Sequence, residues 1–549
     1  LPFGKEECHE DMCWALGQNL LKVSSYVKKH PQLFGSFVTN FSCGPDSFIV
    51  GYFRDIMKSK PSLTLELDSH TADAGVNTRI EAFLDIVNKY RELSKGDTTA
   101  TPFTPARIAY KGTIPQFVTS DNKMVSFLDK KVHLLIPSMG RLSSEILAAS
   151  FRGVGVRSSA IPVYDHEALK LGRGNSSCKE CLPLQLTVGG VLKYLKHRTD
   201  PSELVAYFMP FTPGNCRFPQ YRVFLNEMIK KNRLENVSVF SLTAEKGYVY
   251  EAFKPLERMP FLKGFIIADV MEDIRNALSV LAIDKTKALS IFEEQWNRIV
   301  TLFENKQSGK LYKLLESVAE QLRTIPLKCT LVNARKVSLM GEIFVRRDYF
   351  SCQNLLETLE KRDIVVKRSH FFEWTKYVDY IIEKGIYESN FNFKEWMQFK
   401  TKLVVQNIFE KKIKKIMAKS GLFEYETINI DNIVKLGSNF FDIRFRGESI
   451  LAVGGFFKDI IHHTHGVISI GPFACMPTRV IESVLSADAT TEMKQQLDKS
   501  ASVAELDIQS LPFLPIESDG NPFPQIIEAR IEAFCLQVER LHSKVKQPN

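Results

Sequence analysis

Short apolar runs alternate with amphipathic stretches along most of the chain. The strand-sized apolar runs lie near residues 34–41, 63–67, 132–137, 205–209 and 237–240, with helical patterns between them. Buried strands that are separated by helices are typical of a parallel sheet that is covered on both faces. The pattern therefore predicts an α/β protein.

The later part of the chain changes character twice. Residues 263–325 have a helical pattern, and strand-like runs then resume at Glu342–Val345 and Ile364–Lys367. A long helical stretch follows at about 374–419, and a last strand-like run at Val467–Ile470 precedes a C-terminal helix. We therefore expect Rossmann-like parallel-sheet domains, repeated, with a helical insertion.

An internal repeat and one change in composition suggest domain boundaries. The run Arg-Ile-Glu-Ala-Phe occurs at 79–83 and at 530–534, each time after an acidic strand end. Chance recurrence of a common helix-start pattern is the alternative explanation. The predicted units are the C-terminal part of a first α/β unit at 1–95, a linker at 96–127, a Rossmann-like domain at 128–262, a helical region at 263–335 and a second Rossmann-like domain with a helical insertion at 336–549.

Charge and apolar content argue against two classes of protein. No run of about 18 apolar residues occurs, so we predict no membrane-spanning helix. The net charge of +9 is modest for 549 residues, and the basic run Lys411–Lys419 has the spacing of a solvated helix face rather than of a nucleic-acid site. Because the ten cysteines come with no secretion signal, we expect reduced thiols and a cytoplasmic location. The chain opens at Leu1 inside patterned sequence, which we interpret as a piece of a longer protein.

Four of the cysteines share a local pattern, with proline two or three positions later and then a helical pattern. They are Cys43, Cys181, Cys216 and Cys475. Proline is expected in the first turn of a helix, so each thiol would lie at a helix N-terminus, where free N–H groups and the helix dipole stabilise a thiolate. Four such loops, far apart in the sequence, suit a large inorganic cluster between domains. A structural zinc site would use paired ligands, and only Cys178 and Cys181 have that spacing.

Six segments contain the most distinctive residues, at 41–48, 67–83, 179–183, 216–221, 341–345 and 471–477. Together they resemble the CoA-substrate-specific enzyme activase-related proteins, which are relatives of the 2-hydroxyacyl-CoA dehydratase subunits and of the double-cubane cluster proteins. The resemblance covers nearly the whole chain. It implies that 128–262 is a cluster-binding domain and that Cys181, Cys216 and Cys475 bind one cubane. Cys43 would belong to a partial copy of the site, with Cys8 as its weaker companion.

The resemblance also implies a cofactor and a partner. The cofactor would be an iron–sulfur cluster, either 4Fe-4S or a double-cubane 8Fe-9S cluster, and three thiolates per cubane would leave one iron open for reductive chemistry. Electrons would come from an ATP-hydrolysing activase, either separate or in the same longer chain, so ATP would bind only there. A homodimer is a further expected assembly. The sequence has no G-x-x-x-x-G-K-[ST] phosphate loop of its own.

Two other interpretations of the cysteines stay open. The chain could be a Rossmann-like nucleotide-binding or CoA-binding module in which the cysteines only pack. It could also be a thiol-dependent enzyme, for which Cys181 beside Glu180 would be the reactive residue.

Overall fold

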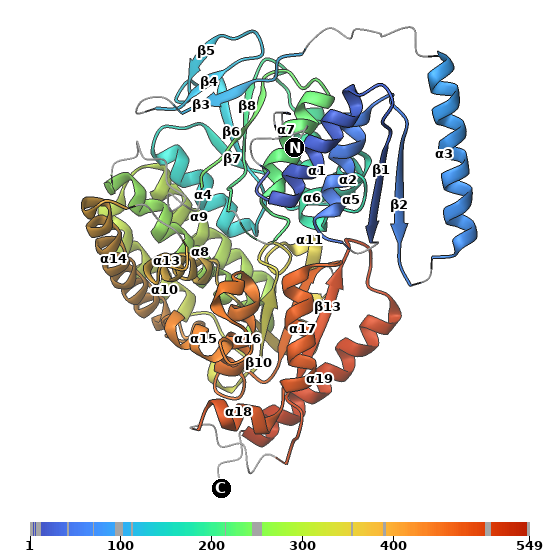
Figure 1. Ribbon diagram of the computed structural model, residues 1–549. Coiled ribbons are helices and arrows are strands. Elements are labelled where there is room, and N and C mark those ends of the chain that lie inside the picture. The colour runs from blue at the N-terminus through green and yellow to red at the C-terminus, as the bar shows by residue number, and fades with distance from the viewer. Residues whose placement is uncertain are drawn as a thin grey trace.

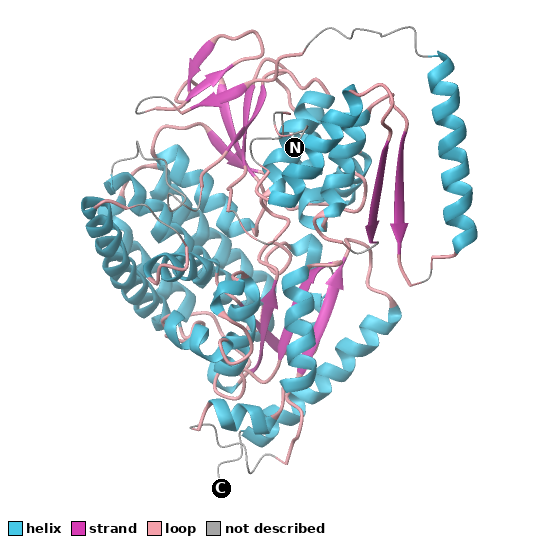
Figure 2. Ribbon diagram, in the orientation of Figure 1, coloured by secondary structure: helices cyan, strands magenta, loops and turns pink. Residues whose placement is uncertain are grey.

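The computed structural model describes residues 12–40, 43–69, 71–93, 103–110, 114–212, 216–243, 255–352, 355–387, 391–499 and 507–545, together with residues 4, 6 and 214. Two four-stranded parallel sheets form its centre, one in the upper and one in the lower half of Figure 1. Helices surround both sheets (Figure 2). The predicted α/β fold class is therefore confirmed. None of the described helices is both long and apolar enough to cross a membrane.

The first parallel sheet has the strand order β7-β6-β8-β9. Its strands are β6 (Val132–Ile136), β7 (Ser158–Ala160), β8 (Leu204–Phe208) and β9 (Val237–Phe240). Every residue of β6, β8 and β9 is buried, because helices cover both faces of the sheet, and these runs are therefore mainly apolar. The helices of this domain are α4 (Arg141–Gly153), α5 (His166–Gly174), α6 (Leu182–His197) and α7 (Gln220–Lys231).

The second parallel sheet has the order β11-β10-β12-β13, so the first strand again lies between the second and the third. Its strands are β10 (Arg335–Gly341), β11 (Ile364–Arg368), β12 (Val467–Pro472) and β13 (Phe513–Ser518). The helices of this domain are α11 (Tyr349–Cys352), α12 (Leu355–Lys361), α16 (Glu448–Asp459), α17 (Met476–Asp488), α18 (Thr491–Leu497) and α19 (Gln525–Val545).

A closely packed helix pair precedes the third strand of both sheets. In the first domain α5 lies against α6, where a Cβ atom added to Gly189 would overlap the carbonyl oxygen of Ala168. In the second domain α15 (Ile430–Gly437) lies against α16, where a Cβ atom on Gly454 would overlap the carbonyl oxygen of Ile433. Both glycines stand in a Val-Gly-Gly sequence. The two domains therefore share strand order and local helix packing.

The remaining helices pack together beside the sheets, at the left of Figure 1. They are α8 (Pro255–Leu281), α9 (Lys285–Glu304), α10 (Leu311–Arg323), α13 (Phe371–Glu383) and α14 (Phe393–Met417), with short 3-10 turns at Ser308–Lys310, Leu331–Asn333, Ala418–Ser420 and Ile443–Phe445. Their shared core contains the fully buried Phe292 and Trp296. Helix α14 begins with a capping box in which Asn392 and Glu395 bind each other's backbone N–H groups. This region contains the helical insertion between β11 and β12.

The N-terminal block, residues 12–93, repeats part of the second domain. Its elements are α1 (Ala15–Lys29), β1 (Gly35–Asn40), α2 (Asp46–Met57), β2 (Ser62–Leu67) and α3 (Asp73–Leu93). Strands β1 and β2 form a two-stranded parallel sheet. The same order of helices and strands occurs in α16, β12, α17, β13 and α19, if α18 is set aside. Cys43 is the third residue after β1, and Cys475 is the third residue after β12.

Two sequence-based assignments differ from the structure. The strand predicted at Glu342–Val345 lies earlier, as β10, and ends at Gly341, which has a φ of 102° and turns the chain. Within the expected linker 96–127, three short strands form an antiparallel sheet. They are β3 (Arg107–Ala109), β4 (Gln116–Val118) and β5 (Met124–Ser126). Phe117 of β4 is fully buried and belongs to the same core as β6 and β8, so this segment packs onto the first sheet.

Candidate functional site

Three of the predicted thiols lie at the beginnings of helices. Cys181 is the N-cap residue of α6 and Cys475 is the N-cap residue of α17, and each helix has proline at its second position. Cys216 lies four residues before α7 begins, and the backbone N–H of Phe218 points to its Sγ at 3.5 Å. The helix starts therefore bring N–H groups and the positive end of the helix dipole toward these sulfurs.

The structure brings Cys181, Cys216 and Cys475 together. Burial raises the pKa of the Cys216 thiol well above its usual value, and the nearby Cys475 and Cys181 raise it further. Cys181 and Cys475 are 6% and 5% exposed. Cys216 has exposed surface as a residue, although many protein atoms surround its thiol. The loop after β8 contains Cys216 and the loop after β12 contains Cys475, so the third strands of both sheets lead into the same place.

Arg217 connects these loops. One of its guanidinium nitrogens, Nη2, donates to the carbonyl oxygens of Phe473 and Ala474 at 3.1 Å each. Cys181 joins the same place from α6, because its Sγ lies 2.7 Å from the hydroxyl oxygen of Tyr221 on α7. The site therefore forms where α6, the start of α7 and the loop before α17 meet.

Arg217 is also a buried cation with no carboxylate at ion-pair distance among the described residues. Arg217 is 8% exposed. Burial opposes its charge, but the groups around it, Cys181, Tyr221, Cys475 and Cys216, hold its pKa above the usual value. An uncompensated charge in the interior is costly. Because burial raises the pKa of these thiols, they would offset the charge of Arg217 as ligands of an anionic group rather than as free thiolates.

The distances between the three sulfurs help to distinguish a single zinc ion from an iron–sulfur cubane. Among the described residues, one group of three His, Cys, Asp or Glu side chains has donor atoms that all lie within 4.8 Å of one another. That group does not include Cys181, Cys216 or Cys475. At least two of the sulfurs are therefore more than 4.8 Å apart. A single tetrahedral zinc ion needs sulfurs about 3.8 Å apart, given Zn–S bonds of about 2.3 Å. The ligand sulfurs of a cubane are roughly 6–7 Å apart, which lies above this lower limit.

The N-terminal block adds thiols to this region. Cys43 is half-buried, and burial raises the pKa of its thiol. Its neighbour Gly44 faces Arg217, since a Cβ atom there would lie 3.7 Å from Arg217 Cδ. Cys13 was not predicted, yet Gln220 Nε2 lies 3.6 Å from its Sγ. Cys8 lies outside the described residues.

Two partly buried carboxyl groups lie near the thiols. Burial and the nearby Glu342 together raise the pKa of Glu448 to about 8. Burial also raises the pKa of the Cys475 thiol to about 12, with both glutamates adding to the effect. Each carboxyl group accepts a backbone hydrogen bond, Glu448 from Ile343 at 2.9 Å and Glu342 from Val345 at 2.8 Å. Glu342 lies in 341–345, one of the six distinctive segments of the sequence. Its local sequence did not indicate that its carboxyl group lies near the thiols.

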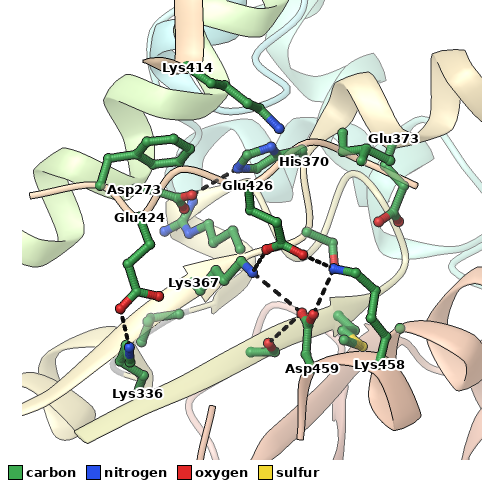
Figure 3. Close-up of a pocket in the computed structure, with 18 of the residues that line it drawn as sticks. Asp273, Lys336, Lys367, His370, Glu373, Lys414, Glu424, Glu426, Lys458 and Asp459 are labelled. Atoms are coloured by element: carbon green, nitrogen blue, oxygen red, sulfur yellow. Dashed lines mark hydrogen bonds and ion pairs between the residues drawn. The ribbon is translucent and has the colours of Figure 1, made fainter. Parts of the chain in front are cut away.

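A separate cavity of about 80 Å³ lies between the second sheet and helices α8, α13, α14 and α16 (Figure 3). Its wall contains Glu426 and Asp459, which form a possible metal-ligand group with His463. Lys367 lies 2.9 Å from Glu426 and 3.6 Å from Asp459, and Lys458 pairs with both carboxylates. These ammonium groups hold the pKa of Glu426 well below its usual range even though burial opposes ionisation. We therefore interpret the cluster as an ion-pair network that joins the helices to the sheet.

A second hydrogen-bonded chain lies near the amino ends of β6 and β8. Ser159 Oγ lies 2.8 Å from His133 Nε2, and His133 Nδ1 lies 2.9 Å from Glu203 Oε1. This order resembles that of a hydrolase triad. However, Arg157 donates to the same Glu203 oxygen at 2.6 Å and neutralises the carboxylate. The chain links β6, β7 and the start of β8, and we interpret it as structural.

The other described cysteines divide into two groups. Cys178 and Cys329 are exposed, whereas Cys352 and Cys535 are buried. Cys352 Sγ donates to the carbonyl oxygen of Val345 at 3.1 Å, and Cys535 lies in the core of the second domain. Comparison with models of known protein families and with curated protein sequences finds no match to this chain.

Proposed function

We propose that the chain holds an iron–sulfur cluster on Cys181, Cys216 and Cys475 and works in low-potential electron transfer or reduction. The observation that supports this most strongly is the buried Arg217, which has no carboxylate at ion-pair distance in the described part of the chain and lies near three thiols. Thiolates are the ligands that iron–sulfur clusters prefer. The resemblance to 2-hydroxyacyl-CoA dehydratase subunits and activase-related proteins points to the same chemistry.

The residues around the thiols would each have a part in this function. When bound, the cluster would accept and release single electrons. Arg217 and the helix N-termini stabilise negative charge on the sulfurs, and Tyr221 orients the sulfur of Cys181. ATP would be hydrolysed on a partner activase or on an activase module of a longer chain.

Cys43 belongs, in this proposal, to a neighbouring second site on the N-terminal block. It occupies the same place after β1 that Cys475 occupies after β12. A double-cubane 8Fe-9S cluster would use both sites, whereas a single 4Fe-4S cluster would use the trio alone.

Two observations disfavour the other interpretations. For a thiol-dependent enzyme, Cys181 would need a lowered pKa, but burial raises the pKa of its thiol. Glu180 instead accepts the backbone N–H of Ser177. For a nucleotide-binding module, phosphate would be expected at the loop between β6 and α4. That loop is covered, since a Cβ atom on Gly140 would lie 3.2 Å from the carbonyl oxygen of Arg347.

Anaerobic reconstitution with ferrous iron and sulfide tests the proposal. We expect a brown, oxygen-sensitive protein with acid-labile sulfide and broad absorbance near about 400 nm, from thiolate-to-iron charge transfer. Metal analysis of protein purified anaerobically provides the contrast. A stoichiometric amount of zinc with no iron would contradict the proposal.

A further inference from the structure

Arg217 contacts three separate parts of the molecule. It belongs to the loop that follows β8, and it donates to the backbone carbonyls of Phe473 and Ala474, which precede Cys475. Its Nη1 atom also lies 3.5 Å from Ser47 Oγ on α2 of the N-terminal block. Ser47 in turn donates to the carbonyl oxygen of Gly44 at 2.6 Å, in the loop that contains Cys43. One side chain therefore links both sheet domains to the N-terminal block.

None of these partners carries a formal negative charge. Carbonyl and hydroxyl oxygens satisfy N–H groups, but they do not neutralise a guanidinium, which stays protonated in proteins. Among the groups that raise the pKa of Arg217, the three thiols Cys181, Cys216 and Cys475 would each carry a full negative charge as ligands of a cluster. The position of Arg217 should therefore depend on whether the thiol site is anionic.

The N-terminal block also has contacts that do not involve this charge. Phe48 of α2 stacks on Tyr221 of α7 with ring centroids 6.3 Å apart, and Lys231 pairs with Asp55 at 3.1 Å. Such contacts keep the block attached when the thiol site is neutral. A change of charge at Arg217 would then act locally, on the Cys43 loop and the first turn of α2.

We propose that Arg217 is a positioning residue that couples negative charge at the thiol site to the docking of the Cys43 loop and the first turn of α2. The inference rests on the proposed function, because a bound cluster supplies that charge. Loading of the cluster then orders the loop through Arg217 and Ser47. The same guanidinium favours the reduced, more negative state of the cluster and so raises its reduction potential.

Hydrogen exchange and redox titration of the whole chain, with and without reconstituted iron, test this inference. In the wild type we expect iron loading to slow amide exchange in peptides that cover residues 43–57. Arg217→Gln keeps hydrogen-bond donors but removes the charge. It should lose the iron-dependent protection and shift the reduction potential to a more negative value. Arg217→Lys restores the charge and should recover most of both properties.

A second variant separates docking from electrostatics. Ser47→Ala removes the hydroxyl contact but no charge, so it should lose part of the iron-dependent protection while its reduction potential stays at the wild-type value. Unchanged protection and potential in Arg217→Gln would overturn the inference and leave the cluster assignment intact. Equal loss of iron in Arg217→Gln and Arg217→Lys would also overturn it, since charge would not be the relevant property. A wild type that binds no iron would instead contradict the proposed function and, with it, this inference.

Discussion

Glu448 shows how strongly the region around the thiols departs from ordinary solvent conditions. Its side chain is 13% exposed, and burial together with Glu342 raises its pKa to about 8. Arg346 lies 3.9 Å away and compensates only in part. A glutamic acid in this position is held mostly neutral near pH 7, as expected where desolvation and a like charge both oppose ionisation.

This pKa gives a prediction about stability and pH. A group whose pKa is higher in the folded than in the unfolded state stabilises the fold at low pH, and this contribution is lost as the pH rises. For Glu448 this stabilising contribution should be lost between pH 4.5, the ordinary pKa of glutamate, and about pH 8, its pKa in the folded protein. Glu448→Gln keeps an oxygen for the Ile343 N–H and cannot ionise. The unfolding free energy of Glu448→Gln should therefore fall less between pH 5 and pH 8.5 than that of the wild type. The two decreases should differ by about 1.4 kcal/mol or more.

Denaturant unfolding of the metal-free protein at several pH values measures this difference. Glu320→Gln is a matched control, because Glu320 is 62% exposed on α10 and pairs only at the surface. The control should follow the wild type. Parallel pH profiles for Glu448→Gln and the wild type would show that Glu448 ionises normally.

At the scale of the elements, helices α5 and α6 can pack closely only because Gly172 and Gly189 have no side chain. A Cβ atom on Gly189 would overlap the carbonyl of Ala168, and one on Gly172 would overlap the carbonyl of Gln185. The start of α6 contains Cys181, so the distance between these helices also fixes the position of that thiol. The pair α15–α16 repeats this packing in the second domain through Gly437 and Gly454.

Gly189→Ala should therefore destabilise the protein by about 2 kcal/mol or more, because backbone atoms cannot move aside as a flexible side chain can. Gly174→Ala is the matched control at the end of α5, where a Cβ atom would meet nothing within 4 Å. We expect that substitution to be neutral or to stabilise by up to about 1 kcal/mol. Thermal and denaturant unfolding of the two variants gives the comparison. Equal stability of both would contradict the packing described here.

Most of the strands and helices could be predicted from the sequence, because buried parallel strands are short apolar runs and the helices between them are amphipathic. The prediction failed at Glu342–Val345, where an apolar run follows the strand instead of forming it. The turn at Gly341 depends on a positive φ and on contact with Ile470, neither of which a local pattern contains. The short strands β3 to β5 were missed for a related reason, since they are held by contact of Phe117 with the first sheet's core.

The candidate site could be predicted only in part. The sequence pattern singles out Cys43, Cys181, Cys216 and Cys475 because each stands before a helix start with proline nearby, a feature within a few residues of sequence. Cys13 precedes a helix without a proline, and Arg217 acquires its importance only when loops more than 250 residues apart meet. Such contacts are set by the tertiary fold. The cluster itself stays a prediction.

At the scale of the whole molecule, the two sheet domains place equivalent loops opposite each other. The strand order is the same in both, and the third strand of each leads to one of the thiols Cys216 and Cys475. Sites at the carboxyl ends of parallel strands are typical of α/β proteins. The repeat therefore accounts for a thiol site built from residues nearly 300 positions apart.

Iron content of matched cysteine variants, measured after anaerobic reconstitution, tests the central claim most directly. Cys216→Ala and Cys475→Ala should lose most of their iron, because three thiolates around one cluster act as a unit. Cys535 is fully buried in α19 and away from the site, so Cys535→Ala should keep its iron and lose on the order of 1 kcal/mol of stability. Full iron content in Cys475→Ala together with loss of iron in Cys535→Ala would contradict the assignment of the thiol site.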